Sequence, residues 1–308
     1  MERLKMIEIV GIGANVCDTL LTVDSYPKED TKKRAEDITL SGGGPCATGL
    51  CCASKLGAKC GYLGTFTDDT AGEFLQSDIK KYGVSLDFSR KKEGYNSFTS
   101  YILISKDMAS RTCVFHKGDI PEGSLDAEQI EAIKDAKLLL IDGNDMTAAR
   151  EAVKIARESG TLVLYDAGGR YEGVESLLEY TDVLIPSEEF ALSITDSDSA
   201  EFAAKILYEK YSPKVVVITQ GKDGGVIYDG NTVKKYPAFK VEAKDSNGAG
   251  DVFHGAFSFA LVRGMDYYSA AVFSSAVSAI KCTSVGARAA VPSYDQAINF
   301  LKERGYEL

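Results

Sequence analysis

The sequence predicts an α/β fold in which a doubly wound, mostly parallel sheet is flanked by helices. From about residue 136 onward, short β-branched or leucine-rich runs alternate with amphipathic runs of helix length, as in parallel sheets covered on both faces. Four earlier segments instead alternate polar and apolar residues, like strands with one solvated face. We therefore expect a main domain (residues 1–17, 41–96 and 118–308) with a small inserted β-sheet lid (residues 18–40 and 97–117).

The main domain is expected to begin with a strand, a helix rich in small residues, a second strand and a second helix, at residues 6–14, 45–56, 58–64 and 69–82. Later strands are expected at residues 137–141, 161–165, 182–185 and 214–219. Helices between them, each beginning near a Ser or Thr that can cap it, are expected at residues 147–159 and 200–210. Residues 224–229 and 232–236, split by Gly230-Asn231, predict a hairpin at the sheet edge. Three helices follow, at residues 248–263, 266–283 and 293–303.

The inserted sheet is predicted from the alternating segments at residues 18–26, 34–40, 97–105 and 111–116. A sheet of this size is too small to fold alone, so the main domain or a second subunit must cover its apolar face. Tyr26-Pro27 and Gly94 supply bends at which it could hinge. We expect a homodimer that forms through the lid.

Composition restricts the function classes. The 308-residue chain has 44% hydrophobic and 26% charged residues, as ordinary globular proteins do, and its net charge of −10 argues against nucleic acid as a partner. No run of about 18 apolar residues occurs and Met1–Val10 is charged, so we expect no membrane span and a cytoplasmic location. Seven cysteines without a C-x-x-C pair indicate reduced thiols. The chain has only two histidines, His116 and His254, which argues against a His-based metal site or a Ser-His-Asp catalytic triad.

The most informative motif is the run Asp245-Ser246-Asn247-Gly248-Ala249-Gly250-Asp251, which opens the long apolar segment 252–262. Small residues at the start of a helix leave backbone N–H groups without intrahelical partners, and glycine lets an anion approach them. The Asp251 carboxylate lies in the same turn, where it could take a proton from an attacking hydroxyl. An anion cradle beside a base indicates phosphoryl transfer. The simpler alternative is a tight turn with Asp251 as the helix N-cap.

A second glycine run, Gly42-Gly43-Gly44-Pro45, leads into the helix expected from Cys46. Such a run lets a ligand approach the backbone and the free N–H groups of the helix, but it could equally be a hinge between the lid and the main domain. Asp18 follows the first strand, at the edge where open α/β sheets bind ligands. Its carboxylate could accept hydrogen bonds from vicinal hydroxyls, or it could simply be solvated.

Two further segments are compatible with a nucleotide. Thr219-Gln220-Gly221-Lys222-Asp223-Gly224-Gly225 closes a strand, where glycine can admit phosphate or ribose, although a plain turn is the simpler interpretation. Residues 282–288 interrupt the C-terminal helices and leave carbonyl groups that could ligate a cation or face a base. Loop termination explains the same segment without a ligand.

The glycine run at residues 42–45 with Leu56-Gly57-Ala58 after it, and the Gly-Ala-Gly-Asp core of residues 248–251, resemble the two signatures of the ribokinase (PfkB-type) carbohydrate kinase family. The resemblance covers nearly the whole chain, including the order of strands and the inserted lid. It implies a ribokinase-like fold and ATP-dependent phosphorylation of a hydroxyl on a small sugar or sugar-like alcohol. Bound Mg²⁺ would spread the phosphate charge, and many members also bind a monovalent cation such as K⁺.

The resemblance also implies roles for individual residues. Asp251 matches the catalytic base, and the N–H groups of Gly248, Ala249 and Gly250 match the anion hole for the transferred phosphoryl group. Three further sets match the sugar contacts, the nucleotide contacts and the monovalent-cation site, respectively: Asn15, Asp18, Gly42, Gly43 and Gly44; Thr219, Gly221, Gly224 and Cys282; and Asp245, Ser284 and Gly286.

The chain departs from the family pattern at two places. Many members have Asn where this chain has Ala47, which puts one sugar hydrogen bond in doubt. The Asn-x-x-Glu motif that organises Mg²⁺ through water is replaced by Ser187-Glu188-Glu189-Phe190-Ala191, which is closer to the ketohexokinase-like branch. There Glu189 is the first candidate for the metal role and Glu188 the second.

Ser110-Arg111-Thr112 on the lid resembles the same branch, which implies that Arg111 reaches substrate; the alternative is a solvated edge-strand charge. Lid closure is expected to exclude water, so that phosphate goes to the sugar. Two alternatives remain open: a nucleoside or sugar-phosphate kinase on the same fold, and a catalytically silent sugar-binding regulator. Five basic residues near the lid could bind a second phosphate: Lys32, Lys33, Arg34, Arg111 and Lys117.

Overall fold

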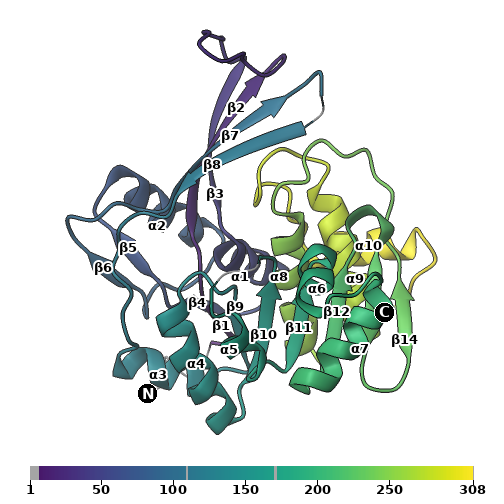
Figure 1. The fold of residues 1–308 in the computed structure, drawn as a ribbon. Coiled ribbons are helices and arrows are strands. Elements are labelled where there is room, and N and C mark those ends of the chain that lie inside the picture. The colour runs from purple at the N-terminus through teal and green to yellow at the C-terminus, as the bar shows by residue number, and fades with distance from the viewer. Residues whose placement is uncertain (1–6, 109, 170–171, 308) are drawn as a thin grey trace.

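The computed structural model describes residues 7–108, 110–169 and 172–307, and an eight-stranded sheet lies at its centre (Figure 1). Its strand order is β14-β13-β12-β11-β10-β9-β1-β4, in which the six strands from β12 to β4 are parallel and the β13–β14 hairpin is antiparallel. The bounds are β1 (Ile9–Ile12), β4 (Cys60–Tyr62), β9 (Leu138–Ile141), β10 (Leu162–Ala167), β11 (Val183–Pro186), β12 (Val215–Thr219), β13 (Gly225–Tyr228) and β14 (Val233–Tyr236). The predicted mostly parallel sheet is confirmed; Met6 of the first predicted strand lies outside the described residues.

Helices cover both faces of this sheet, because its strands are apolar on both sides. The first face is covered by α1 (Pro45–Leu56), α2 (Thr70–Lys81), α8 (Ala249–Val262), α9 (Tyr267–Lys281) and α10 (Tyr294–Lys302). The opposite face is covered by α3 (Ala127–Asp135), α4 (Met146–Ser159), α5 (Glu175–Leu178), α6 (Glu188–Thr195) and α7 (Ala200–Tyr211). No helix in the described ranges is both long and apolar enough to cross a bilayer.

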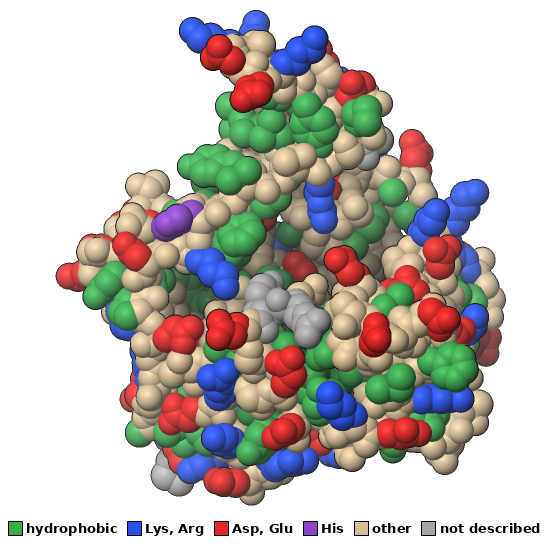
Figure 2. Space-filling model, in the orientation of Figure 1, with side chains coloured by type: hydrophobic (Ala, Val, Ile, Leu, Met, Phe, Trp, Pro, Cys, Tyr) green, Lys and Arg blue, Asp and Glu red, His purple; other side chains and the backbone are tan. Residues whose placement is uncertain are grey.

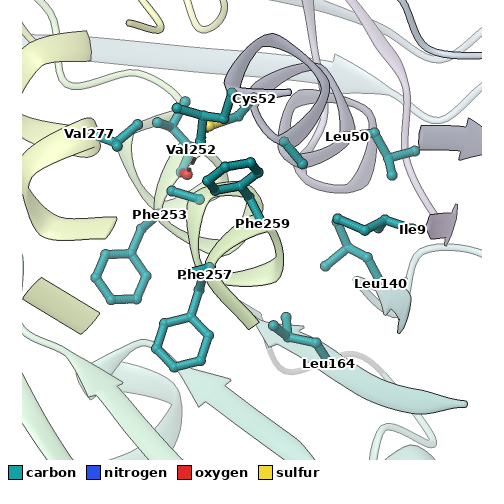
Figure 3. Close-up of a cluster of buried hydrophobic side chains, with 14 of the residues drawn as sticks. Ile9, Leu50, Cys52, Leu140, Leu164, Val252, Phe253, Phe257, Phe259 and Val277 are labelled. Atoms are coloured by element: carbon teal, nitrogen blue, oxygen red, sulfur yellow. Dashed lines mark hydrogen bonds between the residues drawn. The ribbon is translucent and has the colours of Figure 1, made fainter. Parts of the chain in front are cut away.

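The small residues of α1 allow α8 to approach it closely. A Cβ on Gly255 of α8 would lie 2.2 Å from the carbonyl oxygen of Gly49 in α1, so the two backbones are in direct contact. Beside this contact, Cys52 of α1 donates to the Val252 carbonyl at 3.4 Å, and Phe257 points towards the sheet (Figure 3). This packing fixes the start of α8 relative to α1.

A four-stranded sheet of order β3-β2-β7-β8 projects from the main domain, and we call it the lid sheet (Figure 1). Its strands are β2 (Val16–Val23), β3 (Asp37–Gly43), β7 (Thr99–Ser105) and β8 (Ser110–His116). β2 and β3 run past the expected lid limits at residues 18 and 40, so Gly42 and Gly43 end a strand and do not form a turn. The small sheet of β5 (Thr65–Thr67) and β6 (Arg90–Lys92) and the helices α3, α5 and α6 were not expected.

The lid sheet has one face towards the main domain and one face towards solvent. Cross-strand register places Ser41, Asp18, Ser100 and Phe115 in one row, and side chains alternate between faces along each strand. Asp18, Ser100 and Arg111 therefore share the face turned towards the main domain. The neighbouring row of Leu40, Thr19, Tyr101 and Val114 belongs to the outer face.

Candidate active site

The loop before α8 has a geometry that only glycine can supply at residue 248. Gly248 is the N-cap of α8 with φ +73°, and a Cβ at this position would lie 2.7 Å from the Cβ of Ala287. No side chain caps the helix here, and Asp251 is its third residue. The interpretation of Asp251 as a structural N-cap is therefore wrong.

The first turn of α8 opens towards a cavity. The first helical hydrogen bond joins the Val252 N–H to the Gly248 carbonyl at 2.9 Å, so the N–H groups of Gly250 and Asp251 precede it. The space beside Gly250 is open, because a Cβ built there meets no atom within 4 Å. The Ala249 N–H instead donates to the Ser246 carbonyl at 3.2 Å, so this member of the expected anion hole is already engaged.

Asp251 lies among other buried acids. Its burial, followed by the nearby Asp166 carboxylate, raises the pKa of Asp251 to about 7, and Asp142 and Asp18 act in the same direction. His254, one turn further along α8, opposes this rise. Among the described residues, no donor forms a hydrogen bond with the Asp251 carboxylate, so its lone pairs are available to a ligand.

His254 links α8 to the ends of two strands. Its Nδ1 lies 2.6 Å from the carbonyl oxygen of Gly250 and 3.1 Å from Oδ2 of Asp166, and its Nε2 lies 3.0 Å from the carbonyl oxygen of Ile185. Carbonyl oxygens only accept, so the contacts to Ile185 and Gly250 favour a protonated ring. Burial outweighs them and lowers the pKa of His254. In the sequence, His254 stood out only as one of two histidines, and its position beside the first turn of α8 was not predicted.

Asp18 is buried on the inner face of the lid sheet. It is 6% exposed, and Ser100 Oγ donates to its Oδ1 at 2.6 Å. A Cβ on Gly43 would lie 2.0 Å from Asp18 Oδ2, which explains the glycine at that position. Burial raises the pKa of Asp18, whereas Ser100 and the charges of Arg288 and Arg111 oppose the rise. The alternative of a solvated Asp18 is wrong.

Arg288 is a buried residue that holds several polar groups near Asp18 in place, and the sequence did not indicate this role. Its side chain is 1% exposed and forms an ion pair with Asp78 at 2.7 Å. The same guanidinium donates to Asn15 Oδ1 at 2.9 Å and to the Gly43 carbonyl at 2.5 Å. Asn15 is thereby held with its Nδ2 buried and without a hydrogen-bond partner among the described residues. Asn15 also lines a second cavity of about 140 Å³, between the base of the lid sheet and the main domain.

The N-terminus of α1 is not a free anion site. The Asp142 carboxylate, after β9, accepts from the Cys46 N–H at 3.0 Å and from the Ala14 N–H at 2.8 Å. The Ala47 N–H donates to the Ala14 carbonyl at 3.2 Å. The expectation of ligand-binding N–H groups at this helix start is wrong, because Asp142 and the end of β1 already use them. Asp142 lies at the point where the strand order reverses, between β1 and β9.

The segments expected to bind a nucleotide line one cavity of about 560 Å³, next to the first turn of α8. Thr219, Gly221, Gly224 and Cys282 all line it, together with Ala249 and Gly250. Its apolar wall includes Tyr236, Phe239 and Phe253. This size lies within the usual range for small-molecule and cofactor sites, about 300–1,000 Å³.

The two acids considered for a metal lie beside this cavity. Ser187 caps α6 and pairs with Thr219, and Gln220 Nε2 donates to Glu188 Oε1 at 2.7 Å. Glu189 is exposed one residue further. No group of three or more His, Cys, Asp or Glu side chains that could hold a metal ion occurs in the described part of the chain. Mg²⁺ in proteins keeps several waters and commonly uses one or two carboxylates plus phosphate oxygens.

The lid sheet reaches the loop before α8 through Arg111. Arg111 Nη1 donates to Asn247 Oδ1 at 2.8 Å, and Figure 2 shows the hollow between the lid sheet and the main domain. Arg111 is solvent-exposed on the edge strand β8, and this hydrogen bond directs its guanidinium to the loop before α8. The contact joins the lid sheet to the loop that leads into α8.

Of the residues expected for a monovalent cation, Asp245 and Ser284 contact Lys281, and Gly286 contacts Asp245. Asp245 accepts from the Asn247 N–H and from the Gly286 N–H, each at 2.8 Å, which joins the two loops. The Nζ of Lys281 donates to the carbonyl oxygens of Asp245, at 3.0 Å, and of Asn247. The Ser284 N–H donates to the Lys281 carbonyl at 3.3 Å.

Comparisons with known proteins identify the family of this chain and proteins that share its fold. The sequence profile described as "pfkB family carbohydrate kinase" matches residues 6–293. The chain is 29% identical to 5-dehydro-2-deoxygluconokinase of Clostridium tetani (strain Massachusetts / E88), with 99% of this chain and 96% of that protein aligned. Two solved structures share the fold: the Arabidopsis thaliana ribokinase complexed with ribose and ATP (TM-score 0.87, 21% identity, 96% and 99% covered) and the Thermotoga maritima ribokinase (TM-score 0.84, 24% identity, 96% and 99% covered).

Proposed function

This chain belongs to the pfkB family of carbohydrate kinases, which phosphorylate sugars with ATP, and we propose that Asp251 and the first turn of α8 carry out the transfer. The acceptor is a hydroxyl of a small sugar or sugar-like alcohol. The observation that carries the proposal is the first turn of α8: Ala249 and Gly250 line the same cavity as Thr219, Gly221 and Gly224, and the next residue, Asp251, has a carboxylate without a hydrogen-bond partner among the described residues.

Asp251 acts as the general base. A carboxylate with its pKa raised to about 7 is a stronger base than an ordinary aspartate and is still ionised at neutral pH in a large fraction of molecules. Because the sugar hydroxyl is a weak acid, the base accepts its proton as the O–P bond forms. The proton moves to Asp251 as the hydroxyl oxygen attacks the γ-phosphorus, and ADP leaves with the electrons of the broken P–O bond.

The N–H groups at the start of α8 form the anion hole. Gly248 and Gly250 were expected to contribute with Ala249; the open space beside Gly250 supports its role, whereas the Ala249 N–H must share its bond to Ser246. The helix dipole adds a partial positive charge at the same place. The donors stabilise the charge that develops on the transferred phosphoryl group.

ATP with Mg²⁺ is the proposed phosphate donor. The 560 Å³ cavity holds the nucleoside against its apolar wall, with Cys282 at the adenine end and the Thr219–Gly224 loop along the phosphates. Mg²⁺ supplies charge neutralisation on the phosphates when bound. Glu188 and Glu189, in the first turn of α6, would hold it; Gln220, which directly follows β12, donates to Glu188.

The sugar lies between the lid sheet and the main domain. Asp18 accepts from its hydroxyls, the buried Asn15 Nδ2 donates to it, and the Gly42–Gly44 backbone packs against it. The Ala47 side chain has no amide group, so Asn15 is the side-chain amide that we assign as the donor to the sugar. Arg111 closes the site from the lid and excludes water.

The lid sheet also forms the proposed dimer interface. Its outer face exposes Ile38 (66%), Leu40 (50%), Tyr101 (53%) and Val114 (64%), and Figure 2 shows the apolar side chains gathered on the lid. A second copy would cover this face. A cytoplasmic location is part of the same proposal, supported by seven cysteines that are all free thiols in the structure.

Kinetics of the purified protein and an Asp251→Asn variant test the proposal. We expect ATP-dependent turnover on a panel of fructose, ribose, a ketohexose phosphate and adenosine, and a loss of about 10³-fold or more in kcat for the variant, with ATP affinity retained. Near-normal turnover of Asp251→Asn would refute the base assignment. A preference for adenosine would replace the sugar by a nucleoside, and sugar binding without ATP turnover would identify a silent regulator.

A further inference from the structure

Lys281, the last residue of α9, has an unusual environment for a lysine. Its side chain is 0% exposed, and its Nζ donates to two backbone carbonyls, those of Asp245 and Asn247. Lysines are rarely buried to this degree unless their charge is paired. Among the described residues, however, no carboxylate lies within 4.0 Å of Nζ. The ammonium is therefore held by main-chain oxygens of one loop.

That loop carries the proposed anion hole. Residues 245–247 lead directly into Gly248, and Asn247 receives Arg111 from the lid sheet. α9 holds the loop at further points, since the Cys282 carbonyl accepts from the Lys244 and Asp245 N–H groups and Ser278 donates to the Ala249 carbonyl at 2.7 Å. The Lys281 contact is thus one of several between the end of α9 and this loop, and it is the only one of these made by a charged group of α9.

The contact to Asn247 sets the direction of the next N–H. In a planar trans peptide, the C=O of one residue and the N–H of the following residue point in opposite directions. When the Asn247 carbonyl turns towards the ammonium, the Gly248 N–H turns away from it. The same relation holds for the Asp245 carbonyl and the Ser246 N–H. A cation on the carbonyl side therefore orients donors on the opposite side of the loop and raises the positive potential there.

We propose that the Lys281 ammonium is a built-in cation that orients the anion-hole loop, and that it takes the position that the resemblance assigned to K⁺. This rests on the proposed function of residues 248–251. A K⁺ ion does not fit beside it, because the carbonyls of Asp245 and Asn247 that would ligate the ion already accept from Nζ, and a second positive charge would be repelled. Lys281 is a positioning residue, and the enzyme needs no monovalent cation.

The wild-type protein gives the first test. Turnover is measured with ATP, Mg²⁺ and the preferred acceptor in a buffer whose only other cation is tetramethylammonium, and again after addition of K⁺ or Na⁺. We expect kcat to stay within about twofold, because the cation is supplied by the chain. Activation of about tenfold or more by K⁺ would overturn the inference and leave the proposed kinase function intact. Absence of turnover on any acceptor would instead refute the proposed function.

Lys281→Ala gives the second test, with Lys244→Ala as the matched control. Lys244 lies on the same loop, and its side chain is exposed. In tetramethylammonium buffer, we expect Lys281→Ala to lose about 10–10³-fold in kcat with a smaller change in the KM for ATP, and Lys244→Ala to behave as wild type. Added K⁺ or methylammonium should restore at least tenfold to Lys281→Ala only, since a small cation can enter the space left by the side chain.

A structural role would give a different pattern. If Lys281 only filled space, Lys281→Met would retain kcat, and cations would not rescue Lys281→Ala; either result overturns the inference. Circular dichroism and thermal melts identify a variant that does not fold. In that case the cation response of the wild-type enzyme still decides between the two outcomes.

Discussion

The raised pKa of Asp251 couples the chemistry to the stability of the fold. An unfolded aspartate titrates near pH 3.9, whereas in the folded chain the pKa is raised to about 7, so between these values the folded state binds more protons. The free energy of unfolding therefore falls as the pH rises through this window. The Asp251 carboxylate is accommodated at the expense of stability at neutral pH.

Asp251→Asn is expected to remove this loss. We predict that the variant is more stable than wild type at pH 8, by about 1 kcal/mol after screening by solvent in the cleft, and equally stable near pH 4. Thermal melts of both proteins at several pH values measure the difference. A stability difference that does not grow between pH 4 and pH 7 would contradict the raised pKa. The kcat of the wild-type enzyme should fall below about pH 7, because the base becomes protonated.

Arg288 connects the stability of the fold to the proposed sugar site through single hydrogen bonds. Replacing it by Met leaves the Asp78 carboxylate unpaired and releases Asn15 and the Gly43 carbonyl. We predict a destabilisation of about 3–5 kcal/mol, as for one partner removed from a buried pair.

The double variant Arg288→Met, Asp78→Leu provides the control, because it removes both charges. It should recover much of the stability and still show a KM for the sugar raised by about tenfold or more, with the KM for ATP near wild type. Equal changes in both KM values would indicate a general distortion of the fold and would contradict a specific role in placing Asn15 and Gly43.

At the scale of elements, periodicity was sufficient to place strands and helices but not their polar contacts. The alternation along residues 18–26 and 97–105 correctly predicted strands with one buried face, and Asp18 lies on that face because register follows the pattern. The small residues of 45–56 predicted α1 to its observed ends. The short α6 was missed, because eight residues with two acids at the start give little apolar periodicity.

The candidate site, too, was predictable in its local motifs but not in its long-range contacts. The glycine-rich segments around residues 219–225 and 245–251 predicted a nucleotide loop and an anion cradle, and the structure brings both segments together around one cavity. Lys281 and Arg288 could not be predicted, since a cation at or after a helix C-terminus usually lies in solvent beside the helix dipole. Their burial depends on acceptors from distant segments, such as Gly43 and Asn247, which periodicity does not reveal.

The contact between α1 and α8 predicts the effect of one added methyl group. Gly255→Ala places a Cβ 2.2 Å from the Gly49 carbonyl, so α8 must shift and the first turn moves with it. We expect a destabilisation of about 1–3 kcal/mol despite the better helix propensity of Ala, together with a lower kcat. Gly123→Ala is the control, because its Cβ meets no atom closer than 3.8 Å. A Gly255→Ala variant with wild-type melting temperature and kcat would show that the close approach does not constrain the site.

At the scale of the whole molecule, the lid sheet has two faces with different demands. Its inner face carries Asp18 and Arg111, which must meet the main domain, whereas its outer face exposes large apolar side chains that water solvates poorly. A second copy seated on the outer face would bury them and would stiffen the strands that hold Asp18. Dimerisation would therefore support sugar binding without adding a residue to the site.

We predict a dimer in solution that a single charge on the outer face separates. Val114 lies opposite Tyr101 in the row that also contains Leu40, so Val114→Glu places a carboxylate on the apolar face, next to Tyr101. Light scattering of the eluted protein should give twice the chain mass for wild type and the chain mass for Val114→Glu. Phe202→Glu is the matched control. Phe202 is 63% exposed, like the lid residues, but it lies on α7, which is far from the lid sheet (Figure 1), so this variant should remain dimeric.

The monomeric variant should keep ATP binding while the KM for the sugar rises, because the free lid strands lose their support. A monomeric wild-type protein across the concentrations used in the assay would refute the lid interface, and a dimer that persists in Val114→Glu would place the interface elsewhere.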